Sequence, residues 1–278
     1  MSCLITGHNG LLGPYVIKSL QGKIDIYTCS RSAGDYRMDL TDESSVARLC
    51  KKIKPNLIIH CAAFTDVDEA EQNPSNAYSV NQHATKNIIK NISSDSHFIY
   101  ISTDQVYPDT EGLHKEGEEN PINVYGKSKW KGALEAKKHQ KTTIVHTNMI
   151  GSSLSKKRKS FSDVIIESLK KGDHFKLFSD SFFSPLHFET ISHILNHIIE
   201  SGIIGIYNLG SREGMSKEDF ILNMSKHLSL SSSNTESILS GSILNRARRA
   251  HDLRMNVQKL QKVLKFSMPT LMEEIKKL

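Results

Sequence analysis

Residues 3–13 read Cys3-Leu4-Ile5-Thr6-Gly7-His8-Asn9-Gly10-Leu11-Leu12-Gly13. The apolar run at 3–6 has the length of a buried strand, and three glycines follow it. Glycine allows a tight turn and lets other groups approach the main chain closely. A helix expected over 11–20 would begin with free N–H groups, which bind phosphate. The stretch predicts a strand, a phosphate-binding turn and a helix, although an ordinary strand-to-helix turn is the alternative.

The same alternation continues through the first 150 residues. Short apolar runs predict strands at 24–29, 57–61, 98–102 and 143–147, with helices between them at 44–53, 77–92 and 125–138. Parallel strands that are buried on both faces read as continuous apolar runs, as Leu57-Ile58-Ile59 does. The pattern predicts an α/β fold, a doubly wound parallel sheet of the Rossmann type with helices on both faces.

After residue 150 the pattern is less regular. We expect helices at 161–171, 189–199 and 216–227, a strand at 206–209, and a mobile connection in the serine-rich stretch 229–242. Residues 255–278 carry apolar side chains at helical spacing. Residues 1–150 with 185–210 are expected to form the dinucleotide-binding domain, and 151–184 with 211–278 a small C-terminal α+β substrate domain.

Composition excludes several classes of protein. No apolar run reaches the roughly 20 residues of a membrane span, and no basic leader precedes Cys3, so we expect a cytoplasmic protein that does not bind membrane. The four cysteines lie in the first quarter of the chain without CxxC spacing and are expected to be reduced core residues. The 13 histidines form no HExxH or zinc-type cluster, which predicts no metal site.

The net charge is +6, but the lysines are spread along the chain, and this argues against a nucleic-acid partner. The densest basic run is Lys156, Lys157, Arg158 and Lys159. It has two interpretations. One is a solvated loop, and the other is an electrostatic guide for an anionic, phosphate-bearing ligand.

The end of the second expected strand indicates which dinucleotide is bound. An acidic residue there would bond the ribose hydroxyls of NAD, whereas Ser30 and Arg31 offer a hydroxyl and a guanidinium to the 2′-phosphate of NADP. Arg31 as a plain surface cation is the alternative. We expect Asp39 and Leu40 to cap the adenine and pack against it. The small residues Cys61-Ala62-Ala63 follow another strand, where a cofactor lies close to the main chain.

Tyr125 and Lys129 lie four residues apart at the start of an expected helix and therefore share one face. An ammonium beside the phenol would lower the phenol pKa, so that the tyrosine can transfer a proton while hydride moves to or from carbon. Thr103 follows the strand at 98–102, and ligands of such sheets bind at the carboxyl ends of the strands. These three residues predict a site in which Thr103 polarises a carbonyl.

The sequence resembles the extended short-chain dehydrogenases. The resemblance rests on GHNGLLG, Asn81, Ser102-Thr103-Asp104 and Tyr125-Gly-Lys-Ser-Lys129. Within that group it is most similar to dTDP-4-dehydrorhamnose reductases and their sugar-nucleotide-binding relatives, through the segments 38–42 and 59–68. The resemblance implies an NADP(H)-dependent reductase of a nucleotide-linked 4-keto-sugar in surface polysaccharide or deoxysugar biosynthesis. It makes Thr103, Tyr125 and Lys129 catalytic. The cofactor would be held by Gly7, Asn9, Gly10, Leu11, Leu12, Ser30, Arg31, Asp39, Leu40, Cys61, Ala62, Ala63, Thr65, Asn81, Tyr125 and Lys129.

The resemblance also implies a substrate wall made of Thr103, Asp104, Gln105 and Met149. Gln105 and Met149 stand where the family presents a tyrosine and a tryptophan, so we expect the sugar to differ from 4-keto-rhamnose. Tyr15 replaces the acidic residue of the magnesium-bridged dimers known in some members. A homodimer of another kind stays open.

Two other functions fit the same motifs. A sugar-nucleotide epimerase would use the same scaffold, whereas a dehydratase would need an Asp-Glu pair, and Gln105 cannot exchange a proton. The second alternative is a non-catalytic NADP-binding regulatory subunit resembling that of methionine adenosyltransferase. Such a subunit needs no substrate pocket.

Overall fold

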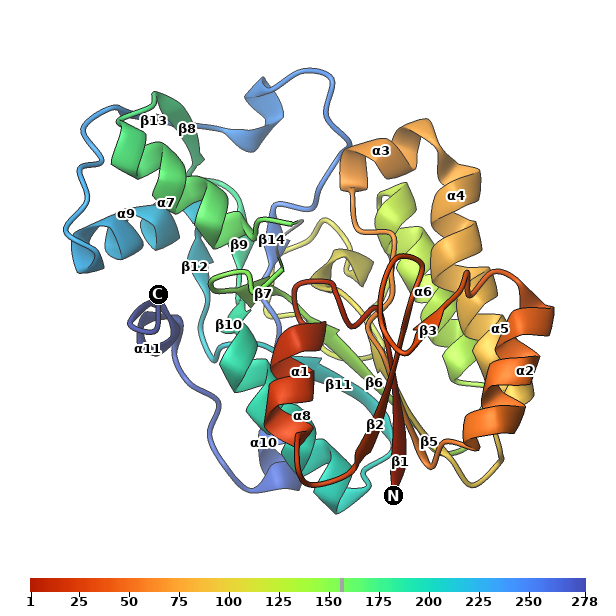
Figure 1. Ribbon diagram of the computed structural model, residues 1–278. Helices are drawn as coiled ribbons and strands as arrows, with labels where there is room; N and C mark the ends of the chain where they lie inside the picture. The colour runs from red at the N-terminus through yellow and green to blue at the C-terminus, as the bar shows by residue number, and fades with distance from the viewer. Residues whose placement is uncertain (156–157) are drawn as a thin grey trace.

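The computed structural model describes residues 1–155 and 158–278; Lys156 and Lys157 of the basic run lie outside the described residues. Its main sheet contains β1 (Ser2–Thr6), β2 (Asp25–Ser30), β3 (Tyr36–Arg37), β4 (Leu57–His60), β5 (His97–Ile101), β6 (Thr142–Thr147) and β11 (Gly205–Leu209). All neighbouring pairs are parallel, in the order β11-β6-β5-β4-β1-β2-β3 (Figure 1). The predicted doubly wound α/β sheet is confirmed.

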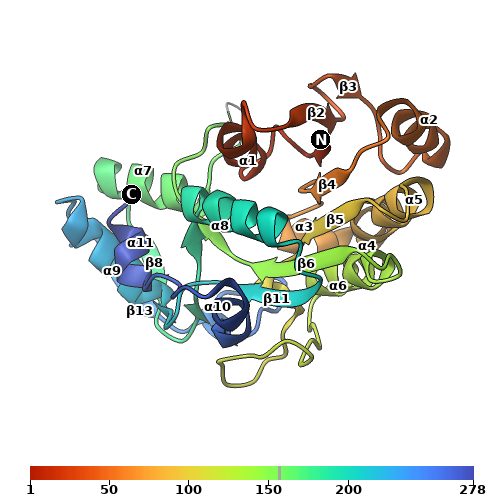
Figure 2. The same cartoon turned by 90° about the horizontal axis from the view of Figure 1, so that it is seen from below.

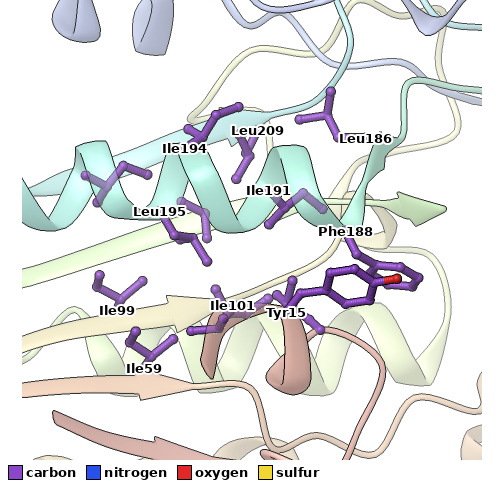
Figure 3. Packing of buried hydrophobic residues seen from close by; sticks show 14 of the residues in the cluster. Tyr15, Ile59, Ile99, Ile101, Leu186, Phe188, Ile191, Ile194, Leu195 and Leu209 are labelled. Carbon is purple, nitrogen blue, oxygen red and sulfur yellow. The ribbon is translucent and has the colours of Figure 1, made fainter. Parts of the chain in front are cut away.

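Helices cover both faces of this sheet. One face carries α1 (Gly13–Leu20) and α8 (Phe188–Ser201), and the other carries α2 (Glu43–Ile53), α5 (Ala84–Asn91) and α6 (Val124–Ala136) (Figure 2). Successive strand residues point to opposite faces, so Ile58 joins one core cluster and Ile59 the other. Figure 3 shows Ile191 and Leu195 of α8 above the isoleucines of β4 and β5.

The strand order reverses between β1 and β4, and this point is the usual ligand crevice of such sheets. Gly7 follows β1 with a positive φ of 67°. A Cβ on Gly7 would lie 2.5 Å from the main-chain nitrogen of Ala62, which follows β4. Glycine is therefore required here both by the backbone conformation and by the close approach of the neighbouring strand end.

The helix predicted over 77–92 is interrupted. It consists of α4 (Pro74–Tyr78), a π-helical turn (Ser79–His83) and α5. Within the turn the main-chain oxygen of Asn81 accepts a hydrogen bond from Thr85 Oγ1 at 2.8 Å, which holds the widened geometry. The sequence pattern also missed α3 (Val67–Gln72) and the short β3, because neither is long enough to show a period.

The second region combines short strands with helices. Its elements are β7 (Met149–Ile150), α7 (Phe161–Lys171), β8 (Phe175–Phe178), β9 (Phe182–Phe183), β10 (Leu186–His187), β12 (Met215–Ser216), α9 (Lys217–His227), β13 (Thr235–Ile238), β14 (Asp252–Leu253), α10 (Gln258–Leu264) and α11 (Leu271–Ile275). Most of this region lies at the left of Figure 1, whereas its helix α10 lies at the bottom beside α8. The expectation of a mobile connection at 229–242 was wrong. Strand β13 within it pairs in parallel with β8.

In the described part of the chain, no helix is both long and apolar enough to span a membrane. Tyr15 is buried in α1, where its ring stacks on Phe188 and its hydroxyl donates to the main-chain oxygen of Ser152 at 2.6 Å. Tyr15 therefore packs within the core of the sheet region and joins it to the second region by the hydrogen bond to Ser152.

Candidate active site

A cavity of about 490 Å³ opens at the carboxyl ends of the sheet strands. The phosphate turn, the strand ends and the second region all contribute to its wall. It is lined by Gly7, Gly10, Leu11, Leu12, Gly13, Cys61, Ala63, Thr65, Val67, Ile101, Ser102, Thr103, Asp104, Gln105, Tyr125, Lys129, Thr147, Asn148, Met149, Arg158, Phe161, Phe183 and Lys217. The three predicted catalytic residues and the four predicted substrate contacts thus meet in one cavity.

The start of α6 brings Tyr125 to this cavity. Asn123 caps the helix by accepting a hydrogen bond from the main-chain N–H of Gly126 at 2.8 Å. A Cβ on Gly126 would lie 2.1 Å from the carbonyl oxygen of Gln105, so the helix start packs directly on the short 3₁₀ turn Asp104–Val106. Thr103 caps that turn through its Oγ1, which accepts from the N–H of Gln105 at 3.2 Å.

The lysine does not act on the phenol as the sequence predicted. Burial raises the pKa of Tyr125 to about 12; the Thr103 hydroxyl opposes this and the Asp104 charge adds to it. Lys129 Nζ instead donates to the carbonyl oxygen of Ile101 at 2.6 Å and lies over the Tyr100 ring. Burial lowers the pKa of Lys129 to about 7. The expected lowering of the tyrosine pKa by Lys129 is therefore absent from this arrangement of the two side chains.

A buried carboxyl and a cation lie further along the wall. Burial raises the pKa of Asp104 to about 6, against hydrogen bonding from Asn148 and the charge of Lys217. Asn148 Nδ2 donates to Asp104 Oδ2 at 2.5 Å. Lys217 is the first residue of α9, and burial lowers its pKa to about 8 while Asp104 opposes that shift. The second region thus brings a positive charge toward the catalytic residues.

The aromatic residues of the cavity come from unexpected positions. Gln105 and Met149 line the wall, as predicted, and neither carries a ring. Phe161 of α7 and Phe183 of β9 line the same wall and meet edge to face, with ring centroids 6.2 Å apart. The cavity therefore offers aromatic surface to a ligand from the second region.

A second cavity, of about 250 Å³, continues from the phosphate turn along the other side of β1. Many of the residues predicted for the cofactor line it: Gly7, Asn9, Gly10, Ser30, Arg31, Asp39, Leu40, Cys61, Ala62 and Ala63, with Ser32, Met38, Thr41, Val80, Ala84 and Arg158. Asn9 Nδ2 donates to Ser32 Oγ at 3.0 Å, which ties the turn to the loop that carries Arg31. Arg31 is exposed at this end.

Three local features suit a bound dinucleotide. Helix α1 has no side-chain cap and no acidic residue in its first turn, which leaves its N-terminus available to phosphate. The close approach at Gly7 leaves no side chain between the turn and β4. Ser102 Oγ is buried at the catalytic cavity without a hydrogen-bond partner in the described residues, and a ligand group can satisfy it.

Asn81 lies behind the cavity wall instead of at its surface. Its amide bonds the N–H and C=O of Phe64 and the hydroxyl of Ser128. Phe64 lies between Ala63 and Thr65, which both line the cavity. By bonding Phe64, Asn81 therefore holds the segment that carries these two residues. Its position favours a supporting role over direct contact with the cofactor.

Sequence reasoning missed Asn148, Phe161, Phe183 and Lys217 as residues of the site. The isolated aromatic segment around Phe183 was visible as a departure from regular pattern. Lys217 gave no signal, because a lysine at the start of an amphipathic helix is common on protein surfaces. Only the folding of the second region over the sheet brings these side chains to Thr103.

The parallel sheet, the glycine turn at its reversal point and the trio of Thr103, Tyr125 and Lys129 define an extended short-chain dehydrogenase. The chain belongs to the family described as RmlD substrate binding domain, whose model matches residues 1–278.

Individual relatives are similar over most of this chain. A probable low-salt glycan biosynthesis reductase of Haloferax volcanii is 26% identical, covering 99% of this chain and 96% of the relative. The β subunit of methionine adenosyltransferase 2 of Danio rerio is 27% identical over 83% of this chain and 75% of its own. The solved dTDP-4-dehydrorhamnose reductase of Bacillus anthracis, in complex with NADP, superposes with a TM-score of 0.89 at 25% identity, covering 99% and 96% of the two chains.

Proposed function

We propose that this protein is an NADPH-dependent reductase that converts the keto group of a nucleotide-linked 4-keto-sugar to a hydroxyl. One observation carries the proposal: Thr103, Tyr125 and Lys129 line a single cavity together with the glycines of the phosphate turn. The reductases of Haloferax volcanii and Bacillus anthracis support it as relatives of similar length. Surface polysaccharide or deoxysugar biosynthesis is the setting that this activity implies.

Bound NADPH supplies the hydride, and the chain's own residues supply position and protons. The Thr103 hydroxyl and the Tyr125 phenol line the same wall, where they can donate to the keto oxygen as negative charge develops on it. The tyrosine then delivers its proton to that oxygen. Lys129 is buried beside them with its ammonium on the Ile101 carbonyl. It would favour the anionic phenol that is left only after turning from that carbonyl toward Tyr125, because opposite charges attract strongly in a site with little water.

Asp104 and Lys217 are assigned to binding the sugar and take no part in hydride transfer. Above pH 6 the Asp104 carboxylate can accept a hydrogen bond from a sugar hydroxyl, while Asn148 holds its other side. Gln105 bonds Asn123 through its Oε1 and has no proton to exchange, so the cavity lacks the acid–base pair that a dehydratase uses. Reduction is therefore favoured over elimination.

A second candidate is a non-catalytic, NADP-binding regulatory subunit, because the methionine adenosyltransferase β subunit is a relative of comparable identity. Such a role would need the cofactor cavity but not the buried tyrosine and lysine of the larger one. Copurification with a different catalytic chain, together with NADPH binding and no turnover, would favour this candidate.

The test is a panel of dTDP-, UDP-, GDP- and CDP-linked 4-keto-sugars incubated with the protein and NADPH. The expected result is oxidation of NADPH with at least one of them, and formation of the corresponding hydroxyl sugar. NADPH binding without consumption by any member of the panel would contradict a reductase.

A further inference from the structure

Arg158 lies at the boundary between the two ligand cavities, although it belongs to neither a sheet strand nor the phosphate turn. It lines the cavity that contains Arg31 and also the cavity that contains Tyr125. Gly7 and Gly10 line both cavities too. The pyrophosphate that joins the two halves of a dinucleotide must cross this boundary.

Hydrogen bonds attach the chain before Arg158 to the phosphate turn and its helix. Ser155 Oγ donates to the main-chain oxygen of Asn9 at 3.1 Å. Slightly earlier, the main-chain oxygen of Ser152 accepts from Tyr15 Oη at 2.6 Å. Arg158 follows Ser155 by only three residues, so these bonds keep its origin close to the turn.

The Arg158 guanidinium is exposed and has no carboxylate oxygen within 4.0 Å among residues 1–155 and 158–278. The next residue, Lys159, differs in this respect, because its Nζ contacts Glu167 Oε2 at 2.5 Å. A guanidinium that lines the same cavities as the glycine turn and has no carboxylate partner among the described residues suits a phosphate, to which it can donate two parallel hydrogen bonds.

We propose that Arg158 binds the pyrophosphate of the dinucleotide cofactor. This inference rests on the dinucleotide in the proposed function and is independent of the sugar and of turnover. In this arrangement two arginines bind different phosphates of the cofactor. Arg31 binds the 2′-phosphate at the far end of the smaller cavity, and Arg158 binds the pyrophosphate at its junction with the larger one.

The test is fluorescence titration of NADPH and of NADH into the full-length protein and three variants. Arg158→Ala should weaken both cofactors by about tenfold, since both carry the pyrophosphate and a lost charge-assisted contact has that order of effect. Arg31→Ala should weaken NADPH alone. Lys170→Ala removes another exposed cation, from the neighbouring groove that Arg158 also borders, and should change neither.

Adenosine 2′-monophosphate, which lacks the pyrophosphate, should compete equally well against the wild type and Arg158→Ala. The Arg31 and Arg158 substitutions should add in free energy for NADPH, because they act on different phosphates. Unchanged NADH affinity in Arg158→Ala, with an unchanged melting temperature, would overturn the inference. Weakened binding of both cofactors in a protein that reduces no keto-sugar would support it while contradicting the reductase.

Discussion

Among single residues, Tyr125 gives the most direct test of the proposed proton transfer. The phenol is buried beside Thr103, and in the proposed reaction its proton is needed only when charge develops on the substrate oxygen. Tyr125→Phe should therefore lower kcat by about 100-fold or more, while NADPH affinity stays close to that of the wild type. Steady-state kinetics and a cofactor titration on the same preparation measure both. A variant that kept wild-type turnover would remove Tyr125 from the mechanism.

We expect Arg31 to determine the preference for NADPH over NADH. Its guanidinium lies at the end of the smaller cavity with Ser30 and Ser32, where only NADP carries a phosphate. Arg31→Ala should raise the Kd for NADPH by about 10-fold and leave that for NADH unchanged. Equal weakening of both cofactors would show that the arginine does not read the 2′-phosphate.

The raised pKa of Asp104 predicts that the free energy of unfolding falls as the pH rises. Its pKa is raised by burial from 3.8 to about 6, so the folded state holds a proton that the unfolded state has released between these two values. Stability is therefore lost as pH rises through this window. Asp104→Asn removes the buried charge and should stabilise the fold by up to about 3 kcal/mol above pH 6, and by little below pH 4.

Thermal or urea unfolding at pH 4 and at pH 7.5 measures this difference directly. The same substitution should weaken the sugar substrate, since a neutral amide accepts a weaker hydrogen bond than a carboxylate. A stabilisation of equal size at both pH values would show that the charge of Asp104 is not its cause.

At the scale of elements, the turn between β1 and α1 determines whether the cofactor site exists. Gly7→Ala places a Cβ 2.5 Å from the Ala62 nitrogen, in a backbone conformation that alanine adopts reluctantly. It should lower the melting temperature and abolish NADPH binding. Gly22→Ala is the matched control, because Gly22 also has a positive φ, of 77°, but has nothing within 4 Å of its Cβ position. That variant should lose about 1 kcal/mol and keep its cofactor affinity.

The elements that the sequence predicted well are those with a strong period. The strands at 57–60 and 97–101 and the helices at 161–171 and 217–227 agree with expectation to within a residue or two. The π-helical turn at Ser79–His83 was missed because its place in the chain goes with tertiary contacts, here those of the Asn81 amide with Phe64 and Ser128. Strand β13 was missed because four residues gain their structure only by pairing with β8.

The residues of the site also divide into those that the sequence could predict and those that it could not. Thr103, Tyr125 and the phosphate turn could be found in the sequence because each follows a predictable strand or starts a predictable helix. Lys217 and Phe161 could not, since their place depends on how the second region folds over the sheet. The pKa of Tyr125 was predicted with the wrong sign for a related reason. Helical spacing gives proximity to Lys129 but not the direction of the ammonium, which bonds Ile101.

In the molecule as a whole, the sheet and the second region both contribute to the cavity wall, and we expect them together to determine which sugar binds. Gln105 and Met149 offer hydrogen bonds and a flexible apolar surface, while Phe161 and Phe183 supply rings from another side of the cavity. The cavity should therefore turn over dTDP-4-keto-rhamnose poorly and prefer a keto-sugar with another polar substituent or nucleotide. Comparison of kcat/KM across the panel measures this, and a high value for the dTDP-rhamnose precursor would show that residues 105 and 149 carry less weight.

We propose that hydride passes from NADPH to a keto-sugar in the cavity that contains Thr103, Tyr125 and Lys129. The most direct measurement is transfer of deuterium from NADPH labelled at the nicotinamide C4 to the sugar carbon, followed by mass spectrometry of the product with the best substrate of the panel. The wild type should form hydroxyl sugar that carries one deuterium, and Tyr125→Phe should form almost no labelled sugar in the same time. An unlabelled product, or equal amounts of labelled product from both proteins, would contradict hydride transfer at this site.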